Sequence, residues 1–134
     1  MTNIKQAPIA KFQIPNPVIS GRYDLETRSL TFARSVNEYV TALPKTVVNL
    51  EIGKQLVRAG GSVGANYIEA NESLGKKDFV LRMRIARKEA KEARYWIMLS
   101  QPTQCAGKIQ ELLLGEATEL LKILSAIIAK SLDY

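Results

Sequence analysis

The sequence predicts an all-α protein: an antiparallel, up-down-up-down four-helix bundle with an extended N-terminal arm. Apolar residues recur at spacings of three, four and seven along four long stretches, which is the period of a helix with one buried face. Prolines and glycines separate these stretches by short connections, so successive helices should be antiparallel neighbours. No stretch shows the period-two alternation of half-buried strands.

Size and composition fit one domain in a reducing compartment. The 134 residues suffice for a single core. One cysteine, Cys105, excludes an internal disulfide. No run approaches the roughly 18 apolar residues of a membrane span, and the first residues lack the apolar segment of a signal peptide. We expect a cytoplasmic protein with no membrane association.

The arm is predicted over residues 1–22 and the bundle over residues 23–134. Three prolines within the arm exclude a regular helix. Scattered apolar side chains leave two interpretations open, a solvated tail or an extended segment packed on its own bundle or on a neighbouring subunit.

The first two helices are separated by the connector PKTVV, residues 44–48. The first is predicted from an N-cap at Asp24 to about Leu43, before a proline. The second keeps helical register from Leu50 to Leu74 despite internal glycines.

The third helix is predicted from Lys76 to about Gln101, with a heptad seam of mostly small residues. The fourth is predicted from about Lys108 to Leu132 and has two adjacent apolar stripes. Their combined arc is wider than one core face needs, which predicts burial of part of it against another subunit. We therefore expect a homo-oligomer.

The second helix carries glycines on its apolar stripe at Gly53, Gly60 and Gly64. Each costs an interior helix about 1 kcal/mol relative to alanine. We interpret them as a bare surface for close approach of a neighbouring helix, with the alanines of the third helix offering a matching shallow surface. The alternative is that they kink the helix.

A polar stripe follows another side of the second helix in steps of three and four. Its members are Gln55, Arg58, Ser62, Asn66 and Glu69. The stripe is either a solvated face or a hydrogen-bonded network against another helix or subunit, because serine and asparagine are poor choices in a helix interior without partners.

The third helix concentrates the positive charge. Residues 75–101 contain eight cations and three carboxylates, which gives +5 of the net +6. The candidate nucleic-acid-binding residues are Lys76, Lys77, Arg84, Arg87, Lys88, Lys91 and Arg94. A solvated, partly salt-bridged face is the simpler interpretation, but the like-charged pair Arg84 and Lys88 at i, i+4 suggests an external anion. Tyr95 and Trp96 are expected in core or interface packing rather than in base stacking, so binding should be weakly sequence-specific.

Catalytic and cofactor chemistry has little support. The chain contains no histidine, so the usual general base and metal ligand are missing. The glycines of RAGGSVG do not follow a strand, as a phosphate-binding loop would require. We expect no catalytic residues, no metal site and no cofactor.

Two runs, QLVRAGGSVGANYIEANESLGKKDF at residues 55–79 and RIARKEAKEARYW at residues 84–96, resemble one family. It comprises four-helix bundle proteins encoded in intervening sequences of bacterial large-subunit ribosomal RNA genes. The chain is more distantly similar to the accessory variability protein of diversity-generating retroelements. The resemblance spans about residues 23–132. It departs from the family at Gly75, where relatives commonly have a serine N-cap, and at Gly61, where a hydroxyl residue is usual.

This resemblance implies an antiparallel bundle that assembles as a ring-like homopentamer, with a basic surface for nucleic acid and no known catalytic activity. The family's polar signature corresponds to the polar stripe of the second helix. Two main functional hypotheses result. The first is a non-catalytic oligomer that binds RNA or DNA through the third helix, and the second is a scaffold or accessory protein whose partner is another protein. A basic amphipathic membrane-surface helix is a weaker third, since the shallow apolar face of the third helix is needed in the bundle.

Overall fold

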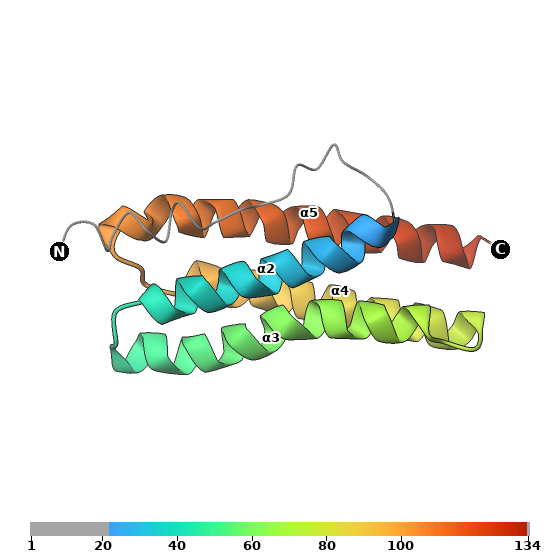
Figure 1. Ribbon diagram of the computed structural model, residues 1–134, viewed down its shortest axis with the longest axis horizontal. Coiled ribbons are helices and arrows are strands. Elements are labelled where there is room, and N and C mark those ends of the chain that lie inside the picture. Colours follow the sequence, from blue (N-terminus) through green and yellow to red (C-terminus); the bar gives the residue numbers. More distant parts are fainter. Residues whose placement is uncertain (1–21, 134) are drawn as a thin grey trace.

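The computed structural model describes residues 22–133, which form four α-helices and one 3-10 helix and contain no strand (Figure 1). The elements are α2 (Arg22–Ala42), α3 (Val47–Asn71), α4 (Lys76–Leu99), the 3-10 helix η1 (Gln104–Ala106) and α5 (Gly107–Leu132). Each helix packs on the next along the chain, and α5 closes the bundle against α2. The predicted antiparallel four-helix bundle is confirmed. The predicted arm lies outside the described residues, apart from its last position, which begins α2.

The helix ends follow local signals in the chain. Pro44 and Pro102 lie in the connections after α2 and α4. Thr46 caps α3, and its side chain accepts a hydrogen bond from the Asn49 backbone N–H at 3.1 Å. Gly75 is the N-cap of α4, in extended conformation and without a side-chain cap hydrogen bond.

Four predicted helix ends need correction. α3 ends at Asn71, three residues before the predicted end at Leu74. α3 begins at Val47, so the two valines of the predicted connector are helical. α4 ends at Leu99, two residues before the predicted end. α2 begins at Arg22, which places Asp24 inside the helix rather than at its cap.

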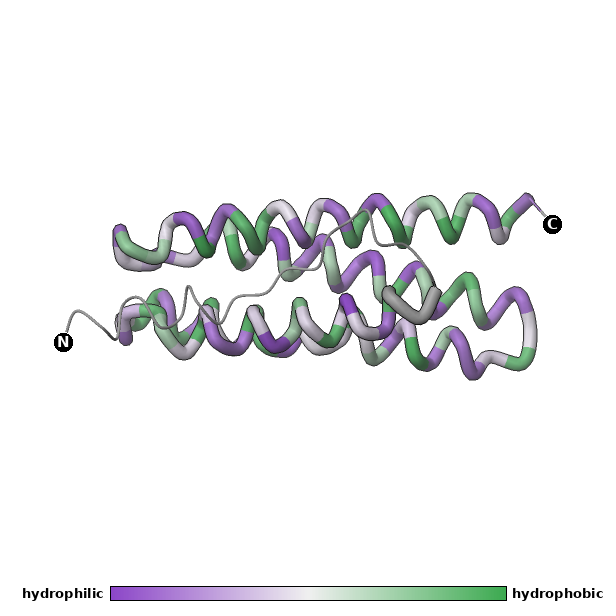
Figure 2. Tube along the Cα trace, turned by 45° about the horizontal axis from the view of Figure 1, so that its top comes forward, coloured by the Kyte–Doolittle hydropathy of each residue, from purple (hydrophilic) through white to green (hydrophobic). Residues whose placement is uncertain are grey.

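The core is continuous along the bundle and alternates large and small residues. Its largest fully buried apolar side chains are Phe32, Val36, Tyr39, Leu56, Val63, Met83, Ile97, Leu113, Leu120 and Leu124. α4 contributes the fully buried alanines Ala86, Ala90 and Ala93. Figure 2 shows hydrophobic positions recurring between hydrophilic ones along each helix, as the sequence periodicity predicts.

The glycines of α3 are a helix contact surface, but their partner is α2 and not the alanines of α4. A Cβ atom at Gly53 would lie 2.9 Å from Val40 Cγ1, and one at Gly64 would lie 2.9 Å from Ser29 Oγ. Gly60 also faces α2. A side chain at these positions would push α2 away, which explains why glycine is used despite its low helix propensity.

The apolar arc of α5 is largely used within the subunit. Leu114 and Leu121, on its second stripe, are half-buried and pack against the core, and Ile128 is buried. Leu112 and Leu132 of α5 remain 50% and 52% exposed, and burial of part of this helix against another subunit stays a prediction. Large exposed apolar residues also occur on α2 and α3, including Leu30 and Ile68.

Polar contacts fix one end of the bundle. Asn49, at the start of α3, is buried and donates from Nδ2 to the Pro44 and Gln101 carbonyl oxygens at 3.0 and 2.9 Å. Its Oδ1 accepts from the Gln101 backbone N–H at 2.9 Å. The buried hydroxyls of Tyr39 and Ser100 are 2.6 Å apart and join α2 to the end of α4. These contacts hold two connections together.

Candidate nucleic-acid interface

Opposite sides of α4 differ completely in character. Its inner side is buried and apolar, centred on the three alanines and Ile97. Its outer side is an exposed row in steps of four and three residues, which we call the outer line of α4. The outer line consists of Lys77, Leu81, Arg84, Lys88, Lys91 and Tyr95. Four of its six residues are cations, so the helix presents positive charge away from the core.

The structure divides the predicted binding residues into two groups. Five are exposed: Lys76, Lys77, Arg84, Lys88 and Lys91. Arg87 and Arg94 are only half-exposed. Arg94 Nε donates to Thr118 Oγ1 of α5 at 3.1 Å, so this guanidinium is tied to the neighbouring helix.

Two of the three carboxylates of α4 are turned toward α3, where one arginine holds them. Arg58 Nη2 lies 2.8 Å from Glu92 Oε1, and Arg58 Nη1 lies 3.6 Å from Glu89 Oε1. Glu89 is buried. Among the ion pairs within residues 22–133, none includes a cation of the outer line. Two carboxylates of α4 thus face Arg58 inside the subunit, while the cations of the outer line and the exposed Asp78 remain on the surface.

The polar stripe of α3 forms a partial network against α4 of the same subunit. Asn66 Nδ2 donates to the Ser62 carbonyl at 2.8 Å, and Arg82 Nη1 of α4 reaches Asn66 Oδ1 at 3.4 Å. Gln55 and Glu69 are exposed. The network interpretation therefore holds for the middle of the stripe, and its two ends face solvent.

The cationic surface continues around the start of α4. A groove between this helix start and the end of α5 is lined by Lys76, Lys77, Asp78, Val80, Leu81, Arg84 and Leu132. Three of the predicted cations line it, which brings positive charge and apolar surface together at one end of the bundle.

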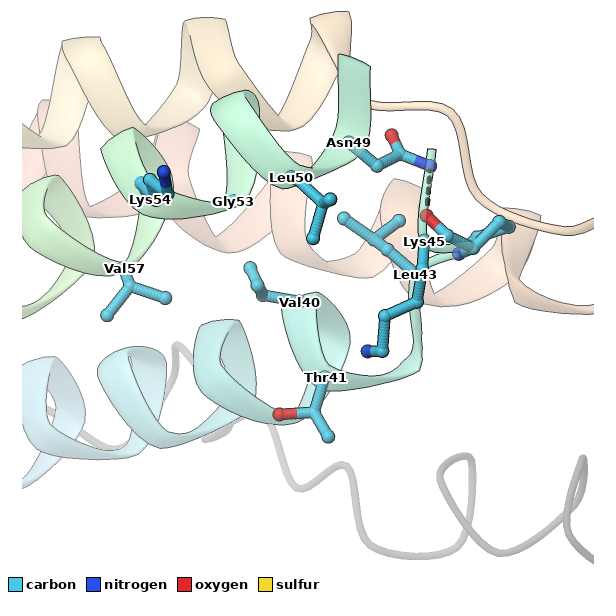
Figure 3. A pocket seen from close by; sticks show the side chains of 10 residues that line it. Val40, Thr41, Leu43, Lys45, Asn49, Leu50, Gly53, Lys54 and Val57 are labelled. Carbon is cyan, nitrogen blue, oxygen red and sulfur yellow. Dashed lines mark hydrogen bonds between the residues drawn. The ribbon is translucent and has the colours of Figure 1, made fainter. Parts of the chain in front are cut away.

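A second kind of surface lies between α2 and α3. Figure 3 shows one groove there, with Val40 of α2 and Leu50 and Val57 of α3 at its sides. A further groove along the same pair of helices is lined by Glu26, Thr27, Ser29, Leu30, Ala33, Gly61, Gly64, Ala65 and Ile68. The two are the α2–α3 grooves, and most of their lining is small or apolar.

Two features escaped the interpretation of the sequence. Arg28 and Glu116 form a buried ion pair between α2 and α5, and both occupy core positions on their apolar stripes. Opposite charges at core positions of two helices are the signal that could have found it. Tyr95 is 53% exposed within the subunit, so it lies outside the core, and its spacing from Lys88 and Lys91 places it on the outer line. Packing of Tyr95 in an interface stays a prediction. Trp96 is half-buried and packs against the core as expected.

The described residues contain no group of three or more histidine, cysteine, aspartate or glutamate side chains placed to hold a metal ion. None of the helices in residues 22–133 has the length and apolar character of a membrane span. Cys105 is a free, exposed thiol in η1.

Residues 23–126 match the family model of the 23S rRNA-intervening sequence protein. The fold is similar to the crystal structure of a protein of unknown function from the S23 ribosomal protein family of Bacteroides thetaiotaomicron, with a TM-score of 0.67 and 32% sequence identity. The match covers 78% of this chain and 97% of that one. No curated protein matches the chain. The family match extends over most of the bundle, so the chain belongs to the 23S rRNA-intervening sequence protein family.

Proposed function

We propose that this protein is a non-catalytic, cytoplasmic homo-oligomer that binds RNA through the phosphates, using the outer line of α4. One observation carries the proposal: four exposed cations share one face of α4, while Arg58 draws Glu89 and Glu92 to another side of the same helix. A cation that is already paired with a carboxylate of the subunit would attract a phosphate less strongly. The cations of the outer line are free of such pairs within the described chain.

Such a face acts on nucleic acid mainly by displacing counterions from phosphates, so affinity should fall steeply with salt. The charge of the outer line comes from lysine and arginine alone, and no asparagine, glutamine or carboxylate stands among its members. Binding should therefore depend on charge and shape more than on base identity. The family name associates the chain with 23S rRNA, which favours RNA over DNA as the natural polyanion.

The test is a charge reversal with a matched control. Arg84, Lys88 and Lys91 are replaced together by glutamate, and the control reverses three exposed lysines on other surfaces, Lys45, Lys54 and Lys122. Both variants change the net charge equally. The α4 variant should lose at least about tenfold in affinity for a labelled RNA, and the control should lose much less, because the proposal assigns phosphate contact to one face. Equal losses would indicate a general effect of net charge and would refute the assignment.

Assembly into a ring, a pentamer as the resemblance implies, would multiply the basic face and raise the avidity for a long polyanion. The α2–α3 grooves support an assembly, because Leu30, Val57 and Ile68 beside them leave 41–50% of their surface exposed. Multi-angle light scattering measures the mass directly. A monomer at micromolar concentration would end the oligomer proposal.

A second candidate function is a scaffold whose partner is another protein. The observation that favours it is the same apolar lining of the α2–α3 grooves, which resembles a protein-contact surface more than a phosphate-binding one. Replacing Leu30 and Ile68 with glutamate should then abolish capture of the partner, and nuclease treatment should leave capture intact. Loss of capture after nuclease treatment would show that RNA links the two proteins and would favour the RNA-binding function.

A further inference from the structure

We infer that the outer line of α4 selects unpaired nucleic acid, with Tyr95 as a stacking platform for a base. This inference rests on the proposed function, since it names the class of strand that the cationic face receives. It assigns to Tyr95 a ligand contact in place of the packing role that its sequence position suggests.

The position of Tyr95 carries the first part of the inference. Tyr95 follows Lys91 by four residues and Lys88 by seven, so the three side chains leave α4 on one side. The buried side of the helix at this level is formed by Ala93 and Ile97. The bundle core therefore makes no use of the exposed part of Tyr95.

The ring is also held in place. The Tyr95 and Trp96 ring centroids are 5.1 Å apart and the planes meet at 74°, an edge-to-face contact. Trp96 is itself half-buried against the core. An aromatic ring supported by a packed neighbour loses little freedom when a base stacks on it, which is what a recognition platform requires.

The surroundings of Tyr95 separate two kinds of contact. Lys88 and Lys91 lie on the N-terminal side, while Met98 and Leu99 on the C-terminal side are 49% and 46% exposed. The surface of α4 around Tyr95 thus changes from charged on one side to apolar on the other. A ligand that fits this surface offers phosphates beside accessible base faces. A duplex hides its base faces in the stack, whereas a single strand or a loop exposes them.

The distances along the helix fit a single strand. At the usual rise per residue, Lys88 to Lys91 spans about 4.5 Å and Lys91 to Tyr95 about 6 Å along the axis. Along the axis of a DNA double helix, the phosphates of each strand are about 3.4 Å apart, and a similar spacing would place one or two nucleotides between contacts. One strand can therefore reach both lysines and present a neighbouring base to the ring.

The experiment compares a uridine oligomer of about 16 nucleotides, which stays unpaired, with the adenosine–uridine duplex of equal length. The proteins are the parent chain, Tyr95→Ala, Tyr95→Phe and, as a control, Leu112→Ala, which removes a half-exposed leucine from α5. Tyr95→Ala should weaken binding of the single strand by about 5- to 100-fold and leave duplex binding nearly unchanged. Tyr95→Phe and the control should bind like the parent. Trp96 is the only tryptophan and contacts the Tyr95 ring. Its fluorescence emission should therefore change when the single strand binds and not when the duplex binds.

Each other outcome overturns the inference. An equal loss for both ligands, or no loss, removes base stacking from the role of Tyr95. A change in solution mass of Tyr95→Ala with unchanged affinity per subunit would make the residue a subunit contact. The proposed function fails separately, when the charge reversal of Arg84, Lys88 and Lys91 leaves binding of both ligands intact.

Discussion

Two charged regions of this bundle use charge in opposite ways. At the α2–α5 contact, Arg28 Nε and Nη2 donate to the two carboxylate oxygens of Glu116 at 2.7 and 2.8 Å, with side chains only 6% and 2% exposed. On the outer line of α4, the cations are exposed to solvent and form no ion pair within the described chain. The first arrangement satisfies its charges internally and can only serve the fold, whereas the second leaves its charges for an external ligand.

The largest loss of stability is expected at the buried pair of Arg28 and Glu116. Glu116→Ala removes the buried carboxylate that accepts hydrogen bonds from Arg28 Nε and Nη2, so the free energy of unfolding should fall, by up to about 3–5 kcal/mol. Chemical denaturation measures this change. The control is Glu119→Ala, whose carboxylate is 39% exposed and pairs with Lys122 at 3.4 Å, and its cost should stay within about 1 kcal/mol.

Replacing both partners of the buried pair tests whether each charge is needed only to neutralise the other. The double variant Arg28→Met, Glu116→Leu should be more stable than Glu116→Ala, because two apolar side chains need no charged partner in a buried site. A double variant as unstable as Glu116→Ala would show that the pair contributes more than mutual neutralisation.

The glycine surface of α3 offers the next largest effect. At Gly64 an added Cβ would lie 2.9 Å from Ser29 Oγ and 3.3 Å from Ser29 Cβ, so Gly64→Ala should cost about 1–3 kcal/mol. At Gly61 nothing lies within 4 Å, and Gly61→Ala should gain about 0.5–1 kcal/mol from helix propensity. Thermal or urea unfolding of the two variants is the check. The same sign for both would contradict the close approach of α2.

A smaller effect appears at alkaline pH. Burial raises the pKa of the Tyr39 phenol, and the hydrogen bond with Ser100 lowers it by less. The folded state thus keeps its proton above about pH 10, where the unfolded chain loses it, so stability should be full below pH 10 and decline above it. Tyr39→Phe should cost about 0.5–1.5 kcal/mol at neutral pH and make this decline shallower. Unfolding curves at neutral pH and above pH 10 test both statements, and a decline as steep in the variant as in the parent would assign it to other groups.

The outer line should contribute least to stability. Arg84→Gln, Lys88→Gln and Lys91→Gln should each change the free energy of unfolding by no more than about 0.5 kcal/mol, because the exposed cations have no internal partner. Removing the repulsion between Arg84 and Lys88 should even raise the free energy of unfolding by a few tenths of a kcal/mol. A loss of several kcal/mol in urea unfolding would place these cations with the buried pair, as parts of the fold.

Much of the fold could be predicted because its signals are local. Helical periodicity gave the four helices, and Pro44, Gly75 and Pro102 marked their separations to within a few residues. Periodicity also placed the glycines on a buried face. It could not say which neighbour they meet, because a face of α3 touches α2 and α4 on adjoining sides and one-dimensional spacing does not distinguish them.

The site was predictable in composition and less so in detail. Spacing identified the exposed cations of α4, but whether a cation is free depends on side chains from other helices. Arg94 donates a hydrogen bond to Thr118 of α5, and Glu92 forms an ion pair with Arg58 of α3. The exposure of Tyr95 likewise depends on how α4 is rotated in the bundle. These properties are tertiary, so the sequence alone could not supply them.

Phosphate contact by the outer line is tested most directly by the salt dependence of RNA affinity. The logarithm of the binding constant of the parent should fall steeply with the logarithm of salt concentration, and the slope should become shallower by about 2 when Arg84, Lys88 and Lys91 are all glutamine, since each lost phosphate contact removes about 0.7 for a single strand. The matched glutamine variant of Lys45, Lys54 and Lys122 should keep the parental slope. Equal slopes for the parent and the α4 variant would contradict phosphate contact by the outer line.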